Sequence, residues 1–178
     1  MIKKSAANRG MKLERLVEKT NNFYKKMGMA LVKKVPTPTK NIGMTANGPK
    51  LVYSKGEWVD FLGMWKGIPI TFDTKEIQLE SFPFAKLHDH QFEFMQEWSR
   101  FGGKAFLIIN FTKYDEYYML PYEVLKDYWE EAKANKGKRG TQSISYKSCQ
   151  YDAVKIEKKD GLLYYLDALE KYYNEETI

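Results

Sequence analysis

The sequence contains very little cysteine and histidine: one cysteine, Cys149, and two histidines among 178 residues. A lone cysteine cannot close an intramolecular disulfide, and without a CxxC or Cys/His pairing we expect no zinc site. Cys149 is therefore expected to be a small buried apolar residue. His88 and His90 flank Asp89, but alternate residues before a helix do not make a closed tetrahedral site. We expect Asp89 to cap that helix, with His90 near DNA or merely exposed.

Long apolar runs are also missing. No stretch of eighteen or more apolar residues occurs, and the first residues, MIKKSAANRGMKLERL, lack the apolar segment of a secretory signal. We therefore expect a cytoplasmic protein. Its hydrophobic content of 43% is enough for one real core, so residues 1–178 are expected to form a single domain.

Positive charge is concentrated near the beginning of the chain. The net charge is +6, but residues 1–34 contain ten basic residues against two acidic ones, which leaves +8 in that segment alone. A second basic segment contains Lys133, Lys136, Lys138 and Arg139. Segregated charge of this kind favours a polyanion on one face, because neutralising phosphates releases counterions. An ordinary solvated basic surface is the alternative.

The spacing of apolar residues predicts an α/β fold. Residues 36–57 are expected to form a projecting loop or hairpin, since 36–50 hold three prolines and two glycines and should be irregular. Helices interleaved with strands indicate a mixed sheet with helices packed on it. The predicted order is helix 9–27, strand 29–35, strands 56–67 and 68–77 joined at Lys66-Gly67, helix 89–101, strands 105–111 and 114–121, and helices 122–134 and 161–173.

The chemistry is expected at Asp60, Asp73 and Lys75. Asp60 and Asp73 fall on successive strands of one hairpin, where their carboxylates can share a hard cation, to which the Thr74 carbonyl adds an oxygen. Asp73 and Lys75 are two residues apart, so a strand directs both side chains to one face. A cation offsets charge in phosphodiester cleavage, and a lysine orients or helps to deprotonate water. Spacing alone is a weak signal, because D-x-K tripeptides are common, and by itself it favours a surface ion pair.

Four segments then resemble one family in their order along the chain. These are NRGMKLE (8–14), KKVPTP (33–38), FDTKE (72–76) and SFPF with HDHQ (81–91). The sequence resembles the RecU-type Holliday junction resolvases, bacterial or phage-encoded, of the PD-(D/E)xK nuclease superfamily. The resemblance implies a restriction-endonuclease-like fold with a projecting stalk. It further implies a homodimer that binds four-way DNA junctions and makes two symmetric nicks with Mg²⁺ or Mn²⁺, with recombinase or branch-migration proteins as possible partners.

Carried over residue by residue, the resemblance makes Asp60 and Asp73 the metal ligands and Lys75 the catalytic lysine. It also implies that Glu14 holds a metal-bound water, although a glutamate on a basic helix often only pairs with a neighbouring lysine. The resemblance further implies that Glu76 and Gln91 line the site or contact phosphate and that Arg9 contacts DNA phosphate. The lysines of the basic N-terminal segment and of the projecting segment are also expected to bind DNA: Lys12, Lys33, Lys34, Lys40, Lys50 and Lys55.

The chain departs from the family pattern at three places. Asp73 stands where the family usually has glutamate, and Val59 stands where it often has a hydroxyl, so one supporting hydrogen bond is expected to be absent. The segment before Asp60 is shorter than the family's stalk and contains lysines but no arginine. Two other functions therefore stay open. One is a related nuclease acting on forked or duplex DNA, and the other is a non-catalytic junction-binding regulator of recombination.

The paired tyrosines near the end of the chain have two interpretations. They can stack on bases, or they can pack the core and a dimer contact, which is the more common use of tyrosine at such spacings. The residues concerned are Tyr117, Tyr118, Tyr164, Tyr165, Tyr172 and Tyr173.

Overall fold

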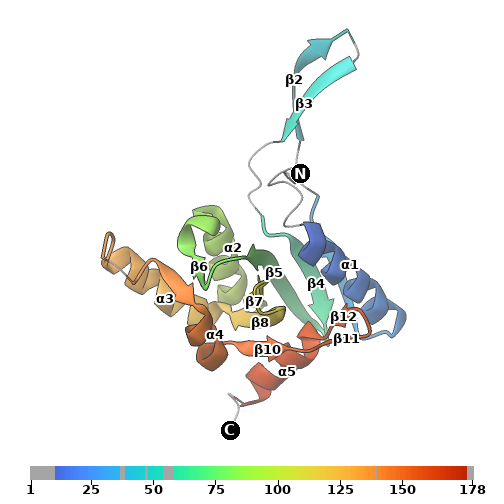
Figure 1. Ribbon diagram of the computed structural model, residues 1–178. Helices are drawn as coiled ribbons and strands as arrows, with labels where there is room; N and C mark the ends of the chain where they lie inside the picture. The colour runs from blue at the N-terminus through green and yellow to red at the C-terminus, as the bar shows by residue number, and fades with distance from the viewer. Residues whose placement is uncertain (1–10, 37–38, 47, 54–57, 139, 176–178) are drawn as a thin grey trace.

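The structure is a computed structural model, and it describes residues 11–36, 39–46, 48–53, 58–138 and 140–175. Its centre is a six-stranded sheet (Figure 1), and the predicted mixed pairing of its strands is confirmed. The central pair is parallel because a helix crosses between its two strands, whereas the other pairs are antiparallel. In spatial order the strands are β1 (Ala30–Lys34), β4 (Phe61–Trp65), β5 (Ile68–Ile77), β7 (Lys104–Phe111), β8 (Glu116–Pro121) and β10 (Val154–Ile156).

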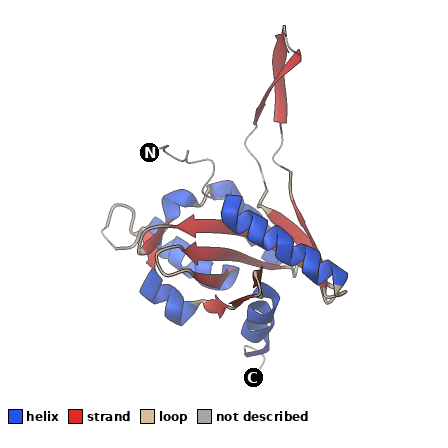
Figure 2. Cartoon of the chain, turned by 45° about the vertical axis from the view of Figure 1, so that its right-hand side comes forward, coloured by secondary structure: helices blue, strands red, loops and turns tan. Residues whose placement is uncertain are grey.

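Helices cover both faces of the sheet (Figures 1 and 2). Helices α1 (Met11–Lys26) and α5 (Tyr165–Glu175) lie on one face, and α2 (Asp89–Arg100), α3 (Tyr122–Ala134) and α4 (Tyr146–Asp152) lie on the other. The alternation along β7 divides the core accordingly. Phe106 and Ile108 pack with α1 and α5, while Leu107 and Ile109 pack with α2 and α3. The prediction that residues 105–111 form a strand covered on both faces is therefore confirmed.

Three rings fix the position of the central strands. Phe72 stacks between Phe61 and Phe106, with ring centroids 4.9 and 4.8 Å apart and planes within 16° of parallel. All three side chains are fully buried. Because β4 and β5 pair with Phe61 opposite Phe72, this stack holds the residues that precede Phe61 and follow Phe72 in a fixed relation.

The segment predicted to project as a loop or hairpin contains a β-hairpin. Strands β2 (Thr39–Thr45) and β3 (Gly48–Tyr53) pair with each other and project from the body of the protein (Figures 1 and 2). Glycine makes the hairpin possible: Gly43 lies at the irregularity in the register and Gly48 follows the turn, both at positive φ. A projecting hairpin was one of the two forms expected, and only the irregular structure predicted for residues 36–50 is wrong where β2 and β3 form.

Several short elements were not anticipated. The predicted helix 161–173 begins only at Tyr165, because Asp160 and Gly161 turn the chain and Leu162–Leu163 form a short strand. Along the described residues, no helix is long and apolar enough to span a membrane. Cys149 is buried and unbridged, as expected. The unanticipated elements are β6 (Ser81–Pro83), η2 (Phe84–Lys86), β9 (Ser143–Ser145), α4, β10, β11 (Lys158–Lys159) and β12 (Leu162–Leu163).

Candidate functional site

Asp60 and Asp73 meet where β4 begins beside β5. The Phe61 to Phe72 register places the two aspartates just beyond the last pair of the ladder, so β5 has no β4 partner from Asp73 onward. Asp60 Oδ2 fills part of that gap by accepting hydrogen bonds from the Thr74 backbone N–H (3.1 Å) and from Thr74 Oγ1 (2.9 Å). The free edge of β5 is thereby joined to the Asp60 carboxylate.

Asp73 and Lys75 lie on the same face of β5, as the strand period predicted. Lys75 Nζ is 3.0 Å from Asp73 Oδ2 and donates a second hydrogen bond to Gln91 Oε1, also at 3.0 Å. The other Asp73 oxygen, Oδ1, accepts the Thr74 N–H at 2.7 Å. The Asp73 side chain is 2% exposed and that of Lys75 is 12% exposed. The ammonium group is therefore held between two acceptors in a largely buried position.

The two carboxylates differ in their affinity for a proton. Burial, followed by the hydrogen bond with Asp60, raises the pKa of Asp73 well above its ordinary value. Burial would also raise the pKa of Asp60, but hydrogen bonds from Asp73 and from the Thr74 backbone and hydroxyl lower it below the ordinary value. Two close buried carboxyl groups cannot easily both ionise, so Asp73 tends to keep its proton beside the Asp60 carboxylate in the metal-free protein.

The donor set at this position fits a hard divalent cation. A cation can take the place of the retained proton, since Asp60 and Asp73 then both become available as carboxylates. In a strand, the N–H and C=O of one residue point to the same edge. The Thr74 carbonyl therefore faces the Asp60 edge together with its N–H. Among the described residues, no group of three or more His, Cys, Asp or Glu side chains is placed to hold a metal. Two carboxylates with water and phosphate oxygens suit Mg²⁺.

Glu14 is connected to the Asp60 and Asp73 pair through Lys34. Its Oε2 accepts a hydrogen bond from Lys34 Nζ on β1 at 2.5 Å, and the Lys34 charge in turn interacts with Asp60. The hydrogen bond to Glu14 is the largest cause of the raised pKa of Lys34. The partner of Glu14 is thus a lysine on β1. The alternative expected from the sequence was a lysine on the same helix, α1.

Glu76 is not brought into the cluster. It follows Lys75 directly, so its side chain leaves the opposite face of β5 and lines a pocket beneath α1. The expectation that Glu76 lines the same site as Asp73 is corrected by this alternation. Gln91 does reach the cluster, through its contact with Lys75.

Gln91 owes its position to the start of α2. The residue before the helix is His88, whose backbone N–H donates to Gln91 Oε1 at 3.2 Å. Asp89 is the first helical residue, so the prediction that Asp89 caps the helix is wrong. The Gln91 side chain turns back toward the preceding loop and there meets Lys75, which a periodicity argument does not reveal.

The Thr74 hydroxyl was missed as a functional group. Val59, which replaces a hydroxyl residue of the family pattern, is buried at 3% exposure. Thr74 Oγ1 donates to Asp60 instead. The sequence offered one signal for this role: Thr74 follows Asp73 directly, so its side chain points to the opposite face of the strand from Asp73.

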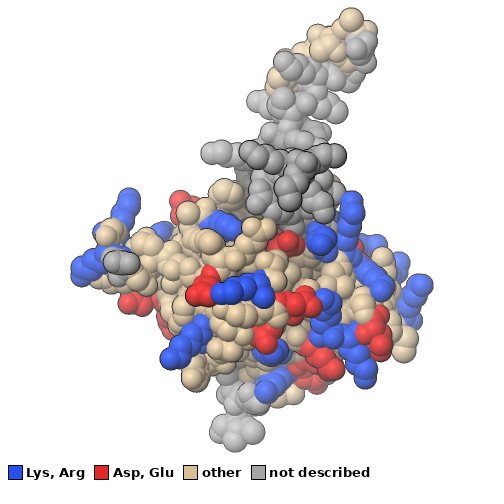
Figure 3. Space-filling view, in the orientation of Figure 1, with Lys and Arg blue, Asp and Glu red and all other residues tan. Residues whose placement is uncertain are grey.

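The predicted DNA-binding residues are only partly described. Lys12 and Lys33 are exposed, and so is every other described lysine and arginine of residues 11–34. In the face shown in Figure 3, basic side chains gather over α1. Arg9 and Lys55 lie outside the described residues, and the side chains of Lys40 and Lys50 in the hairpin are not described. Among the tyrosines, Tyr117, Tyr118 and Tyr165 are buried in the core.

Fold and site together define a mixed α/β protein with an acidic pair and a lysine on adjacent central strands. The chain matches the family described as Recombination protein U over residues 8–171. It is 34% identical over 131 residues to the Holliday junction resolvase RecU of Ligilactobacillus salivarius and 35% identical over 136 residues to that of Staphylococcus aureus. The protein belongs to the RecU family.

The matched regions cover different shares of each chain. They span 70% and 71% of this chain, but 62% and 64% of the two relatives, so this chain aligns with less than two thirds of their length. A weaker likeness relates 62% of this chain to 77% of a solved chain of Hjc, a Holliday junction resolvase of Archaeoglobus fulgidus. With 13% identity and a TM-score of 0.41, that likeness is too low to bear on function.

Proposed function

We propose that the protein is a divalent-metal-dependent endodeoxyribonuclease that resolves four-way DNA junctions as a homodimer. The observation that carries the proposal is the cluster of Asp60, Asp73 and Lys75, in which two carboxyl groups meet at Thr74 beside a largely buried ammonium group. Membership of the RecU family supports the same function.

Each residue of the cluster has a separate role in phosphodiester hydrolysis. Asp60, Asp73 and the Thr74 carbonyl would hold the cation, which when bound neutralises charge on the phosphate in the transition state. Thr74 orients Asp60 through both its N–H and its hydroxyl. Exchange of the retained proton for a cation makes metal binding dependent on pH.

Lys75 is proposed to position the attacking water. An ammonium group has three donors, and two of them are directed to Asp73 and Gln91. The third donor is left for the water or a phosphate oxygen. Because Asp73 and Gln91 hold Lys75 from two different elements, the direction of that donor is set by the fold before substrate arrives.

The dimer and the junction follow from symmetry. Two paired nicks in a four-way junction need two equivalent sites, and a two-fold symmetric dimer supplies them. The projecting hairpin of β2 and β3 offers an element that extends toward the branch point, and the exposed basic residues along α1 offer contacts for phosphates.

The test compares nicking of four-way, forked and linear DNA with and without Mg²⁺. We expect Mg²⁺-dependent paired nicks on the four-way junction. Asp60→Ala and Lys75→Ala should lower the nicking rate by at least about 10²-fold while junction binding stays within about twofold. Lys133→Ala removes an exposed lysine at the end of α3 and serves as the control.

Each other result points to a different function. Faster cutting of forked or linear DNA would identify a related nuclease with another substrate. Junction binding without nicks in Mg²⁺ or Mn²⁺ would identify a non-catalytic junction-binding protein. Full activity of Asp60→Ala or Lys75→Ala would refute the assignment of the site.

A further inference from the structure

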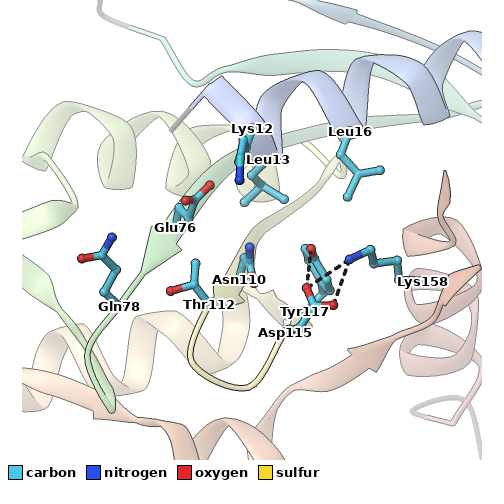
Figure 4. A pocket seen from close by; sticks show the side chains of 10 residues that line it. All are labelled: Lys12, Leu13, Leu16, Glu76, Gln78, Asn110, Thr112, Asp115, Tyr117 and Lys158. Atoms are coloured by element: carbon cyan, nitrogen blue, oxygen red, sulfur yellow. Dashed lines mark hydrogen bonds and ion pairs between the residues drawn. The ribbon is translucent and has the colours of Figure 1, made fainter. Parts of the chain in front are cut away.

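A pocket lies on the opposite face of β5 from Asp73 and Lys75. It has a volume of about 430 Å³, within the range of about 300 to 1,000 Å³ typical of small-molecule sites. Figure 4 shows it beneath the first turns of α1, from which Lys12, Leu13 and Leu16 reach toward the sheet. None of the residues so far placed around the Asp60 and Asp73 pair uses this pocket.

A row of three side chains from neighbouring strands forms its floor. Glu76 pairs in register with Asn110 on β7, and Asn110 pairs with Tyr117 on β8, so the three face the same side of the sheet. Glu76 Oε2 and Asn110 Oδ1 are both buried and have no hydrogen-bond partner among the described residues. Asn110 is only 7% exposed. Two buried acceptors at the floor of this pocket therefore lack a donor, which is a costly arrangement unless a bound molecule supplies one.

The charges around the pocket oppose a simple ion. Lys12 and Glu76 both line the pocket and carry opposite charges. Lys158 Nζ lies 3.0 Å from both oxygens of Asp115. An anion would be opposed by the Glu76 carboxylate, and a bare cation by the Lys12 ammonium group. Since the lining charges balance, the pocket suits a ligand that is neutral and forms hydrogen bonds.

The remaining walls suit a flat ring. Leu13 and Leu16 of α1 contribute apolar surface, and Tyr117 contributes an aromatic ring whose hydroxyl already donates to Asp115 at 3.1 Å. A nucleobase is neutral, flat and carries amino or imino hydrogens along one edge. Enzymes that accept unstacked bases hold them between apolar and aromatic walls and read that edge with hydrogen bonds.

We propose that this pocket receives an unstacked nucleobase of the branched DNA, whose amino or imino hydrogens are donated to Glu76 and Asn110. This inference rests on the proposed function. Glu76 lies three residues beyond Asp73 on the same strand, roughly 10 Å away at about 3.3 Å per residue. Because the pocket lies on the opposite face of β5, a DNA strand would reach it from the scissile phosphate by passing the edge of β5, which has no β4 partner from Asp73 onward. Lys12 at the rim would meet a phosphate of the same strand.

The experiment places 2-aminopurine, which fluoresces more when unstacked, at one position at a time around the branch point of a synthetic four-way junction. Binding is measured in EDTA so that the strands stay intact. We expect fluorescence to rise at one or a few positions with the wild-type protein. Glu76→Gln, which keeps the size of the side chain, and Gln78→Trp, which narrows the rim from an exposed position, should weaken that rise roughly five- to tenfold. Glu93→Gln makes the same charge change on the exposed side of α2 and should leave it unaltered.

The outcomes separate this inference from the nuclease assignment. If no position becomes brighter although the protein binds the junction and nicks it in Mg²⁺, the base pocket is refuted and the nuclease stands. An equal rise with wild type, Glu76→Gln and Gln78→Trp also overturns the inference, because the unstacking then occurs elsewhere. If the protein neither binds nor nicks the junction, both proposals fail together.

Discussion

Divalent cations are expected to stabilise this protein more strongly as the pH rises. In the metal-free protein, burial and Asp60 raise the pKa of Asp73, whereas an aspartate in the unfolded chain titrates near about 3.9. Between these two values the folded chain keeps a proton that the unfolded chain has released. The stability contributed by that proton is full below about pH 3.9 and falls by up to about 1.4 kcal/mol per pH unit until the folded pKa is passed.

A bound cation reverses this trend because it occupies the position of the proton. Below the folded pKa of Asp73, each pH unit should tighten metal binding by up to about tenfold. At a Mg²⁺ concentration of about 100 times Kd, the free energy of unfolding should increase by about 2.7 kcal/mol. For a chain of this length, that corresponds to a rise in Tm of roughly 5 to 11 °C.

The assay is thermal unfolding at several pH values from 5 to 8, with EDTA or with excess Mg²⁺. Asp73→Asn imitates the protonated carboxyl group at every pH, so it should lose most of the metal-induced rise in Tm and flatten the pH dependence of the metal-free protein. Glu93→Gln, an exposed change of the same kind, should behave as wild type. The reasoning is refuted if Mg²⁺ raises the Tm of Asp73→Asn as much as that of wild type, or if the rise in wild type is independent of pH.

Two further substitutions test how the site is positioned. Gln91→Ala removes an acceptor 3.0 Å from Lys75 Nζ, so kcat for nicking should fall roughly ten- to a hundredfold with little change in KM or junction binding, and Gln91→Glu should recover part of the rate. Gly63→Ala would place a Cβ 2.5 Å from the Leu31 carbonyl oxygen and 2.8 Å from Val32 Cα. Unfolding in urea should show a loss of about 1 to 3 kcal/mol, and an unchanged midpoint would show that β1 moves freely.

The parts that could be predicted from sequence are those determined by local pattern. The run at residues 105–111 and the helix at 122–134 were predicted because their apolar spacing extends over many residues. The side of β5 that carries Asp73 and Lys75 follows from the strand period alone. That same period, applied one residue further, would have placed Glu76 on the other face. The resemblance assigned it to the shared site instead.

The remaining features depend on contacts between distant segments. Strands of two or three residues, such as Val154–Ile156, are too short to show a period, and they form because a neighbouring edge is available. Nothing near Gln91 in the sequence indicates that its side chain reaches Lys75, since that contact requires α2 to be packed on the sheet. The role of the Thr74 hydroxyl likewise depends on the pairing of Phe61 with Phe72.

Strand β5 explains why chemistry can be concentrated here at acceptable cost to stability. A buried Asp73 is unfavourable in the metal-free protein, but it lies directly after Phe72, whose ring is stacked on both sides in the core. Removing such a buried ring typically costs about 3 to 5 kcal/mol, so the Phe72 stack contributes strongly to the position of the strand. The apolar residues at the start of β5 therefore hold the strand in place. The polar residues from Asp73 to Glu76 are then available to ligands on both faces of the sheet. Because adjacent residues on one rigid strand point to opposite faces, occupation of one face would bear directly on the geometry of the other.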